Sequence, residues 1–260
     1  MVQHARAAVP DLGPIFAATA APRTPYGQTR PRASRIRAAA ACRESPRCST
    51  IPAAPRGAPT QNTRREPILI DEILNRIDAA NAVDPNRESA DGVDEPAALL
   101  YGRRMSAWID RLRPGAPPAL QIAARAQHIR RWEHPRAEYP ADRRGYLAWR
   151  RGLYTFHAEQ AGAIMRECGA DETLIDRVSF LLHKKQLSDD PDTQALEDAA
   201  CLVFLEHHLD EFAARTDREK MIGILRKTWR KMSEAGRRHA LALDLPEAAR
   251  ELVAEALGDG

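Results

Sequence analysis

Residues 156–200, FHAEQAGAIMRECGADETLIDRVSFLLHKKQLSDDPDTQALEDAA, decide the fold class of this chain. Within this stretch the apolar residues recur at helical spacing, as in Leu174, Ile175, Val178, Leu181 and Leu182. Gly169 is placed to end one helix and Asp171 to cap the next. The run that follows, residues 199–205, is apolar on all sides, which predicts a helix at the centre of a bundle.

The same period extends through the rest of the chain from Pro67. It predicts helices over residues of about 67–83, 96–112, 118–132, 158–168, 171–183, 194–212, 217–232, 233–243 and 246–257, with a short helix around Trp149. Residues 87–95 read as a polar connection, and no segment shows the alternation of a strand. We therefore expect a single all-α, multi-helix domain over residues 67–260.

Residues 1–66 have a different composition. They contain nine prolines, and eleven arginines against three acidic residues, a balance of +8 that leaves −5 for the remainder of a chain of net charge +3. This Arg/Ala/Pro-rich segment is expected to be a disordered tail. A transit peptide has a similar composition, although the prolines interrupt the helix that it needs. A start site assigned too early in GC-rich DNA is the third origin that we consider.

The four cysteines show no CxxC spacing, and no secretory signal is visible, so we expect free thiols and a cytoplasmic protein. No run of about 18 apolar residues is present, so no membrane partner is expected.

Arginine and aromatic residues are concentrated between residues 125 and 151. The basic members are Arg125, His128, Arg130, Arg131, Arg136, Arg143, Arg144, Arg150 and Arg151. Gln121, Arg125, His128 and Trp132 are spaced to share one face of the helix expected over residues 118–132. Arginine binds phosphate bidentately and aromatic rings stack on bases, so a phosphate or RNA site is one interpretation and a solvated face the other.

Long stretches of the chain resemble one family. These are NAVDPN (81–86), AARAQHIRRWEHPR (123–136), YPADRRGYLAWRR (139–151), DPDTQALEDAACLVFLE (190–206) and RKTWRKMS (226–233). From about Ile70 to its C-terminus the chain resembles the family catalogued as domain of unknown function 4202, for which the resemblance implies no established activity.

A histidine, a later histidine at a helix end and a distal carboxylate resemble the HD superfamily of helical phosphohydrolases. The resemblance implies an HD-like bundle and a divalent metal held by His157, His183 and Asp198, with Lys184 in the place of the expected aspartate. Each of these three residues also has a purely structural interpretation. His157 would be a partly buried helix residue, and His183 would interact with the helix dipole. Asp198 would form a salt bridge with Arg125, Arg130 or Lys184.

Two functions follow from these patterns. The first is an HD-like hydrolase or binder of a phosphorylated small molecule or nucleotide. Glu197 and Asp198 would be catalytic, and the substrate would contact Arg125, His128, Arg130, Arg131, Arg136 and Lys184. The second is a non-catalytic RNA-binding or tRNA-binding helical protein that uses the same arginine and tryptophan residues.

Overall fold

The computed structural model describes residues 62–90 and 92–258, with side chains from Leu69 onward. The helices are α1 (Asn62–Asn81), α2 (Ala97–Leu112), α3 (Pro118–Ala126), α4 (Arg143–Glu167), α5 (Glu172–Leu182), α6 (Pro191–His207), α7 (Leu209–Ala213), α8 (Arg218–Lys231), α9 (Glu234–Leu241) and α10 (Glu247–Gly258), with 3-10 turns at Arg131–Glu133 and Arg136–Glu138. The predicted all-α fold is confirmed. Of the tail predicted for residues 1–66, residues 1–61 lie outside the described residues.

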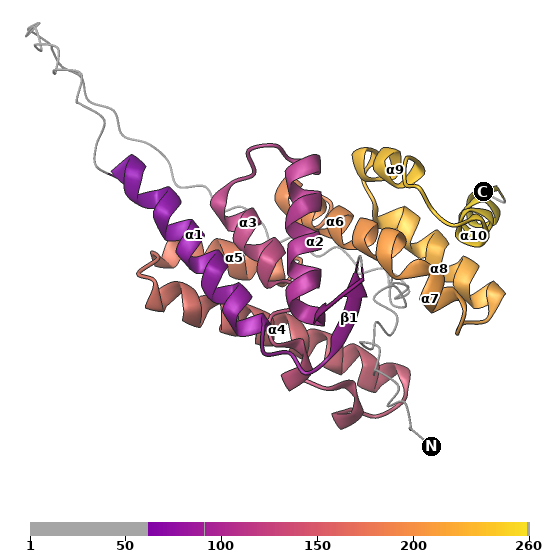
Figure 1. Ribbon diagram of the computed structural model, residues 1–260, viewed down its shortest axis with the longest axis horizontal. Coiled ribbons are helices and arrows are strands. Elements are labelled where there is room, and N and C mark those ends of the chain that lie inside the picture. The colour runs from indigo at the N-terminus through magenta and orange to yellow at the C-terminus, as the bar shows by residue number, and fades with distance from the viewer. Residues whose placement is uncertain (1–61, 91, 259–260) are drawn as a thin grey trace, which may run out of the picture.

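Helix α6 lies at the centre of the bundle, as its sequence predicts. Every residue from Ala195 to Leu205 is buried, and the helix contacts α2, α3, α5, α8 and α9. In Figure 1, α1, α3 and α5 lie on one side of α2, α7 to α10 lie on the other, and α4 passes below α2. Helix α6 therefore joins two groups of helices, and its opposite faces meet different neighbours.

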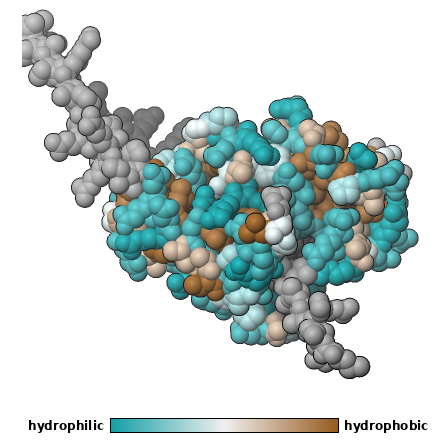
Figure 2. Space-filling view, in the orientation of Figure 1, coloured by the Kyte–Doolittle hydropathy of each residue, from teal (hydrophilic) through white to brown (hydrophobic). Residues whose placement is uncertain are grey.

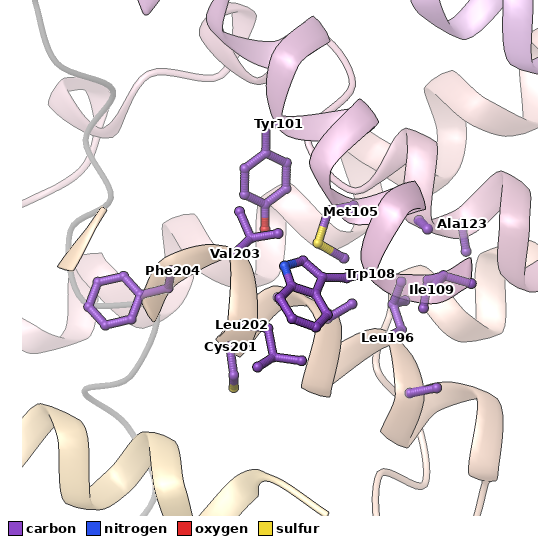
Figure 3. Packing of buried hydrophobic residues seen from close by; sticks show 14 of the residues in the cluster. Tyr101, Met105, Trp108, Ile109, Ala123, Leu196, Cys201, Leu202, Val203 and Phe204 are labelled. Carbon is purple, nitrogen blue, oxygen red and sulfur yellow. The ribbon is translucent and has the colours of Figure 1, made fainter. Parts of the chain in front are cut away.

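The core between α2 and α6 is built from large apolar side chains. Met105, Trp108 and Ile109 of α2 lie beside Leu196 and Leu202 of α6 (Figure 3). Each side chain of this size contributes about 2 kcal/mol on burial. The face of the molecule seen in Figure 2 is mostly hydrophilic, with hydrophobic residues in separate groups.

Three helix starts match the sequence because their caps are local. The carboxylates of Asp171 and Asp217 and the hydroxyl of Ser233 accept hydrogen bonds from backbone N–H groups of the first turns of α5, α8 and α9. Helix α6 differs from its predicted range of 194–212. It begins at Pro191 with Asp190 as its cap, since proline suits the first position of a helix, and it ends at His207.

Helix α1 begins at Asn62, within the segment that was assigned to the tail. Three other expectations were wrong in detail. The expected polar connection contains an antiparallel hairpin, β1 (Arg87–Ala90) and β2 (Val93–Pro96), and Gly92 supplies a positive φ of 78° at its turn.

The remaining two errors concern helix lengths near the site described below. The short helix expected around Trp149 is the first part of α4, a continuous helix of 25 residues. The helix expected over residues 118–132 ends at Ala126. Arg130 has a φ of 48°, which turns the chain. Consequently Gln121, Arg125, His128 and Trp132 do not share one helical face.

Candidate functional site

A pocket of about 490 Å³, measured out to its open mouth, lies where α2, α4 and α6 meet the turns that follow α3 and α5. The lining residues are cationic, imidazole and aromatic side chains with four others: Arg131, Arg150, Lys184, His128, His157, Tyr101, Tyr146, Trp149, Tyr154, Gln127, Leu153, Leu182 and Ala200.

Two strained backbone positions shape the rim of this pocket. Arg130 and Lys184 have φ values of 48° and 53°, in the left-handed region that residues with a Cβ rarely occupy. Each such residue costs on the order of 1–3 kcal/mol, and strain of this kind concentrates at functional sites. The turn at Arg130 is held by its backbone N–H, which donates to Oδ1 of Asn81 at 3.0 Å. The two turns place Arg131 and Lys184 at the pocket.

His157 of α4 is buried, with 4% of its surface exposed. Its Nδ1 lies 2.9 Å from the carbonyl oxygen of Ile129. A carbonyl oxygen can only accept, so Nδ1 carries a proton. Burial, assisted by the charge of Arg131, lowers the pKa of His157 to about 3, so the ring is neutral at pH 7. Within the described part of the chain, Nε2 has no hydrogen-bond partner.

His128 is the second imidazole of the pocket. Its ring stacks on Tyr101, with 3.7 Å between ring centroids and an angle of 14° between the planes. The centroid of His157 lies 6.1 Å away. Burial, followed by the nearby charge of Arg131, lowers the pKa of His128 well below its ordinary value. Both imidazoles therefore stay uncharged beside three cationic side chains.

Lys184 forms a buried ion pair with Glu197 of α6. Its Nζ lies 2.5 Å from Oε2, and the two side chains are 10% and 3% exposed. Lys231 of α8 approaches the other carboxylate oxygen at 3.4 Å. Burial acts to raise the pKa of Glu197, but the charges of the two lysines outweigh it and lower this pKa to about 2. Glu197 is therefore ionised at neutral pH and is shared between two cations.

Arg150 reaches the pocket from α4, about two turns before His157. Its guanidinium carbon lies 5.7 Å from the centre of the Tyr154 ring. Among residues 69–90 and 92–258, no carboxylate lies within ion-pairing distance of Arg150, and Glu197 acts on it only from farther away. Arg131 lies over the face of Trp149, with its guanidinium carbon 4.9 Å from the ring centre.

Asp198 does not belong to this pocket. Its Oδ2 accepts from the Ser233 hydroxyl at 2.5 Å, and its Oδ1 accepts from the Ser233 backbone N–H at 2.8 Å. Gln194 donates to Oδ1 at 3.0 Å. The salt bridge considered from the sequence is absent from the described residues, and Asp198 instead holds the start of α9.

The metal site expected from His157, His183 and Asp198 is not assembled. His183 ends α5, and its Nδ1 lies 2.7 Å from the carbonyl oxygen of Ser179. In residues 62–90 and 92–258, no three His, Cys, Asp or Glu side chains are grouped so that they could hold a metal ion. The residues present do not fit the divalent metal of an HD site, and we derive no reaction step through one.

Arg125, Arg130 and Arg136, predicted to contact substrate, lie outside the pocket lining. Arg125 pairs with Asp78 at 2.7 Å. Arg130 lies 4.0 Å from Glu133 and is 40% exposed. Arg136 donates to the carbonyl oxygens of Tyr139 and Pro140. The structure brings together the other three predicted contacts, His128, Arg131 and Lys184.

The sequence prediction omitted Arg150 from the site, although a signal was present. Tyr146, Arg150, Leu153 and His157 follow one another at spacings of four, three and four residues, which puts them on one face of a helix. The short helix expected before His157 concealed this face. Once α4 is continuous, Arg150 and His157 necessarily point toward the same pocket.

The site and fold define an α-helical protein with a cationic, aromatic-lined pocket. Residues 71–253 match the family described as Domain of unknown function (DUF4202), and the chain belongs to this family. Comparison with curated proteins and with solved structures gave no significant match. Within the described residues, no helix has the length and apolar character needed to cross a membrane.

Proposed function

We propose that this protein binds the phosphate group of a phosphorylated small molecule in the pocket between Arg150 and Lys184. The observation that supports this most directly is the environment of Arg150. Arg150 is half-buried at the pocket, where its neighbours are Tyr154 and Tyr146, and the described residues provide no carboxylate within ion-pairing distance.

A half-buried arginine that has no carboxylate partner can pair with a bound anion, and partial removal from water strengthens that attraction. The guanidinium of Arg150 presents parallel N–H donors that match phosphate oxygens. Lys184 adds a second charge from the turn after α5, and its partner Glu197 is shared with Lys231. Arg131, stacked on Trp149, contributes a third positive charge. A dianionic phosphate monoester complements this group.

We propose binding and not metal-dependent hydrolysis, because the predicted metal ligands are directed to different partners. The catalytic roles predicted for Glu197 and Asp198 gain no support from their surroundings. Glu197 is ionised and held by two lysines, and Asp198 accepts from Ser233 and Gln194. RNA binding stays a prediction, and two of its arginines, Arg125 and Arg136, are engaged within the protein.

Titration calorimetry tests the proposal with inorganic phosphate, AMP and sugar phosphates. Substitution of Arg150→Met removes the charge but keeps much of the side-chain volume. We expect it to weaken binding of every phosphate by about tenfold or more, as is typical for a charge-assisted hydrogen bond.

Arg151→Met is the matched control, since Arg151 is the next residue of α4 and is exposed. The affinity of the Arg151→Met variant for each phosphate should stay within about twofold of the wild-type affinity, because an exposed charge is screened. If wild-type protein binds none of these phosphates, or if the two variants weaken binding equally, the proposal is wrong.

A further inference from the structure

Three residues that line the pocket have buried polar atoms without a hydrogen-bond partner among the described residues: Gln127 at Oε1, Tyr146 at its hydroxyl oxygen and His157 at Nε2. Of these, Nε2 of His157 is the ring nitrogen whose role as an acceptor is fixed by the other nitrogen of the ring. Because Nδ1 donates to the Ile129 carbonyl, the lone pair of the neutral ring is on Nε2. That nitrogen is buried and lacks a partner among the described residues. A buried acceptor left unsatisfied costs about 1–3 kcal/mol. A ligand that fills the pocket can therefore gain affinity by donating a hydrogen bond there.

The groups around His157 keep this nitrogen an acceptor. The charged neighbours that act on it are Arg131, from the 3-10 turn after α3, and Lys184, from the turn after α5. His134 and His128 face it as well. All of them oppose a positive charge on the ring. A fully ionised phosphate oxygen placed against Nε2 would meet a lone pair and no donor, whereas a hydroxyl group would supply the missing proton.

We propose that the ligand carries a hydroxyl group close to its phosphate and donates it to Nε2 of His157, so that the pocket selects phosphorylated polyols. Sugar phosphates and ribonucleotides share this chemistry. The inference rests on the proposed phosphate binding and deepens it: Arg150 and Lys184 hold the anion, and His157 determines which phosphorylated molecule is preferred.

Matched ligand pairs test this preference by calorimetry. The pairs are glycerol 3-phosphate with propyl phosphate, ribose 5-phosphate with pentyl phosphate, and AMP with 2′,3′-dideoxy-AMP. In the wild type at least one hydroxylated member should bind about fivefold more tightly than its partner, as expected for one buried hydrogen bond. The first two pairs report a sugar or polyol phosphate, and the third reports a ribonucleotide.

Variants of His157 connect the preference to this residue. In His157→Phe the ratio of the affinities for the hydroxylated ligand and its partner should fall to near one. The affinity for the partner without hydroxyls should stay within about threefold of the wild-type value. In His157→Gln a carboxamide oxygen can replace the acceptor, so part of the ratio should return. A ratio near one for all three pairs in the wild type, or a ratio that persists in His157→Phe, would overturn the inference.

A spectroscopic measurement keeps the test decisive if His157→Phe does not fold. The nitrogen-15 resonance of His157 Nε2 in the wild type should shift with the preferred hydroxylated ligand and stay in place with its partner. An Nε2 resonance that responds equally to both would also overturn the inference. If all six phosphates bind without discrimination, only this inference fails. If none binds, the proposed phosphate site fails with it.

Discussion

Glu197 and Asp198 are adjacent on α6, yet they belong to different regions of the molecule. Successive helical residues point about 100° apart, so Glu197 faces Lys184 and Lys231 whereas Asp198 faces the start of α9. The pKa of Glu197 is lowered to about 2, because two lysines outweigh its burial. The pKa of Asp198 is raised, because burial outweighs its hydrogen bonds from Ser233 and Gln194. The Glu197 carboxylate therefore compensates buried positive charge, whereas the Asp198 carboxylate connects α6 to the start of α9 through hydrogen bonds.

The largest expected effect follows from removing the charge of Glu197. The substitution Glu197→Gln removes the carboxylate that lies between Lys184 and Lys231, and breaking this buried ion pair should lower the free energy of unfolding by about 3–5 kcal/mol. Urea denaturation measures the change. The double variant Glu197→Gln with Lys184→Met should recover part of the loss, because one uncompensated charge is removed. A double variant less stable than Glu197→Gln alone would contradict this account of the pair.

Acid should lower the free energy of unfolding of the protein through its buried neutral histidines. Burial lowers the pKa of both His157 and His208 to about 3, while the unfolded chain protonates near 6.5. Between these values the unfolded state binds more protons, so stability is complete above about pH 6.5 and falls as the pH decreases toward 3. From pH 7.5 to 5.5 each histidine should cost about 1.4 kcal/mol. The Glu197 contribution persists over that window, since it is lost only below about pH 4.5.

Neighbouring histidines provide the control for this pH dependence. His208 is buried and His207, the residue before it, is exposed. Unfolding curves at pH 7.5 and 5.5 give the free energy of unfolding that is lost between these pH values. This loss should be smaller by about 1.4 kcal/mol in His208→Gln than in the wild type. His207→Gln should keep nearly the full difference. If His208→Gln retains the wild-type pH dependence, His208 does not cause the acid sensitivity.

Features set by local chemistry could be predicted from the sequence. The central helix follows from the apolar run of residues 199–205, and the caps at Asp171, Asp217 and Ser233 follow from single side chains at helix starts. The turn at Arg130 could not be predicted in the same way. Its left-handed φ occurs at a residue that gives no glycine signal, and it is held by Asn81, which is distant in the sequence.

The candidate site was predicted only in part, for the same physical reason. His128 and Arg131 follow from residue type, His157 and Lys184 follow from the spacing that resembles the HD superfamily, and the structure brings all four together. Asp198 and His183 were included because their spacing resembled a metal site. Spacing does not reveal that Asp198 finds Ser233, which is 35 residues away. Partners at such distances along the chain decide whether a polar residue is structural.

The smallest of these stability effects concerns Asp198. The substitution Asp198→Asn keeps the size of the side chain but exchanges one acceptor oxygen for an amide donor, which faces the N–H or O–H of Ser233. We expect a loss of about 1–2 kcal/mol in the free energy of unfolding, and faster hydrogen exchange confined to the first turn of α9. Phosphate affinity should remain within about twofold of the wild type, because Asp198 is not part of the pocket lining. A large loss of phosphate affinity with little loss of stability would instead return Asp198 to the functional site and remove the contrast with Glu197.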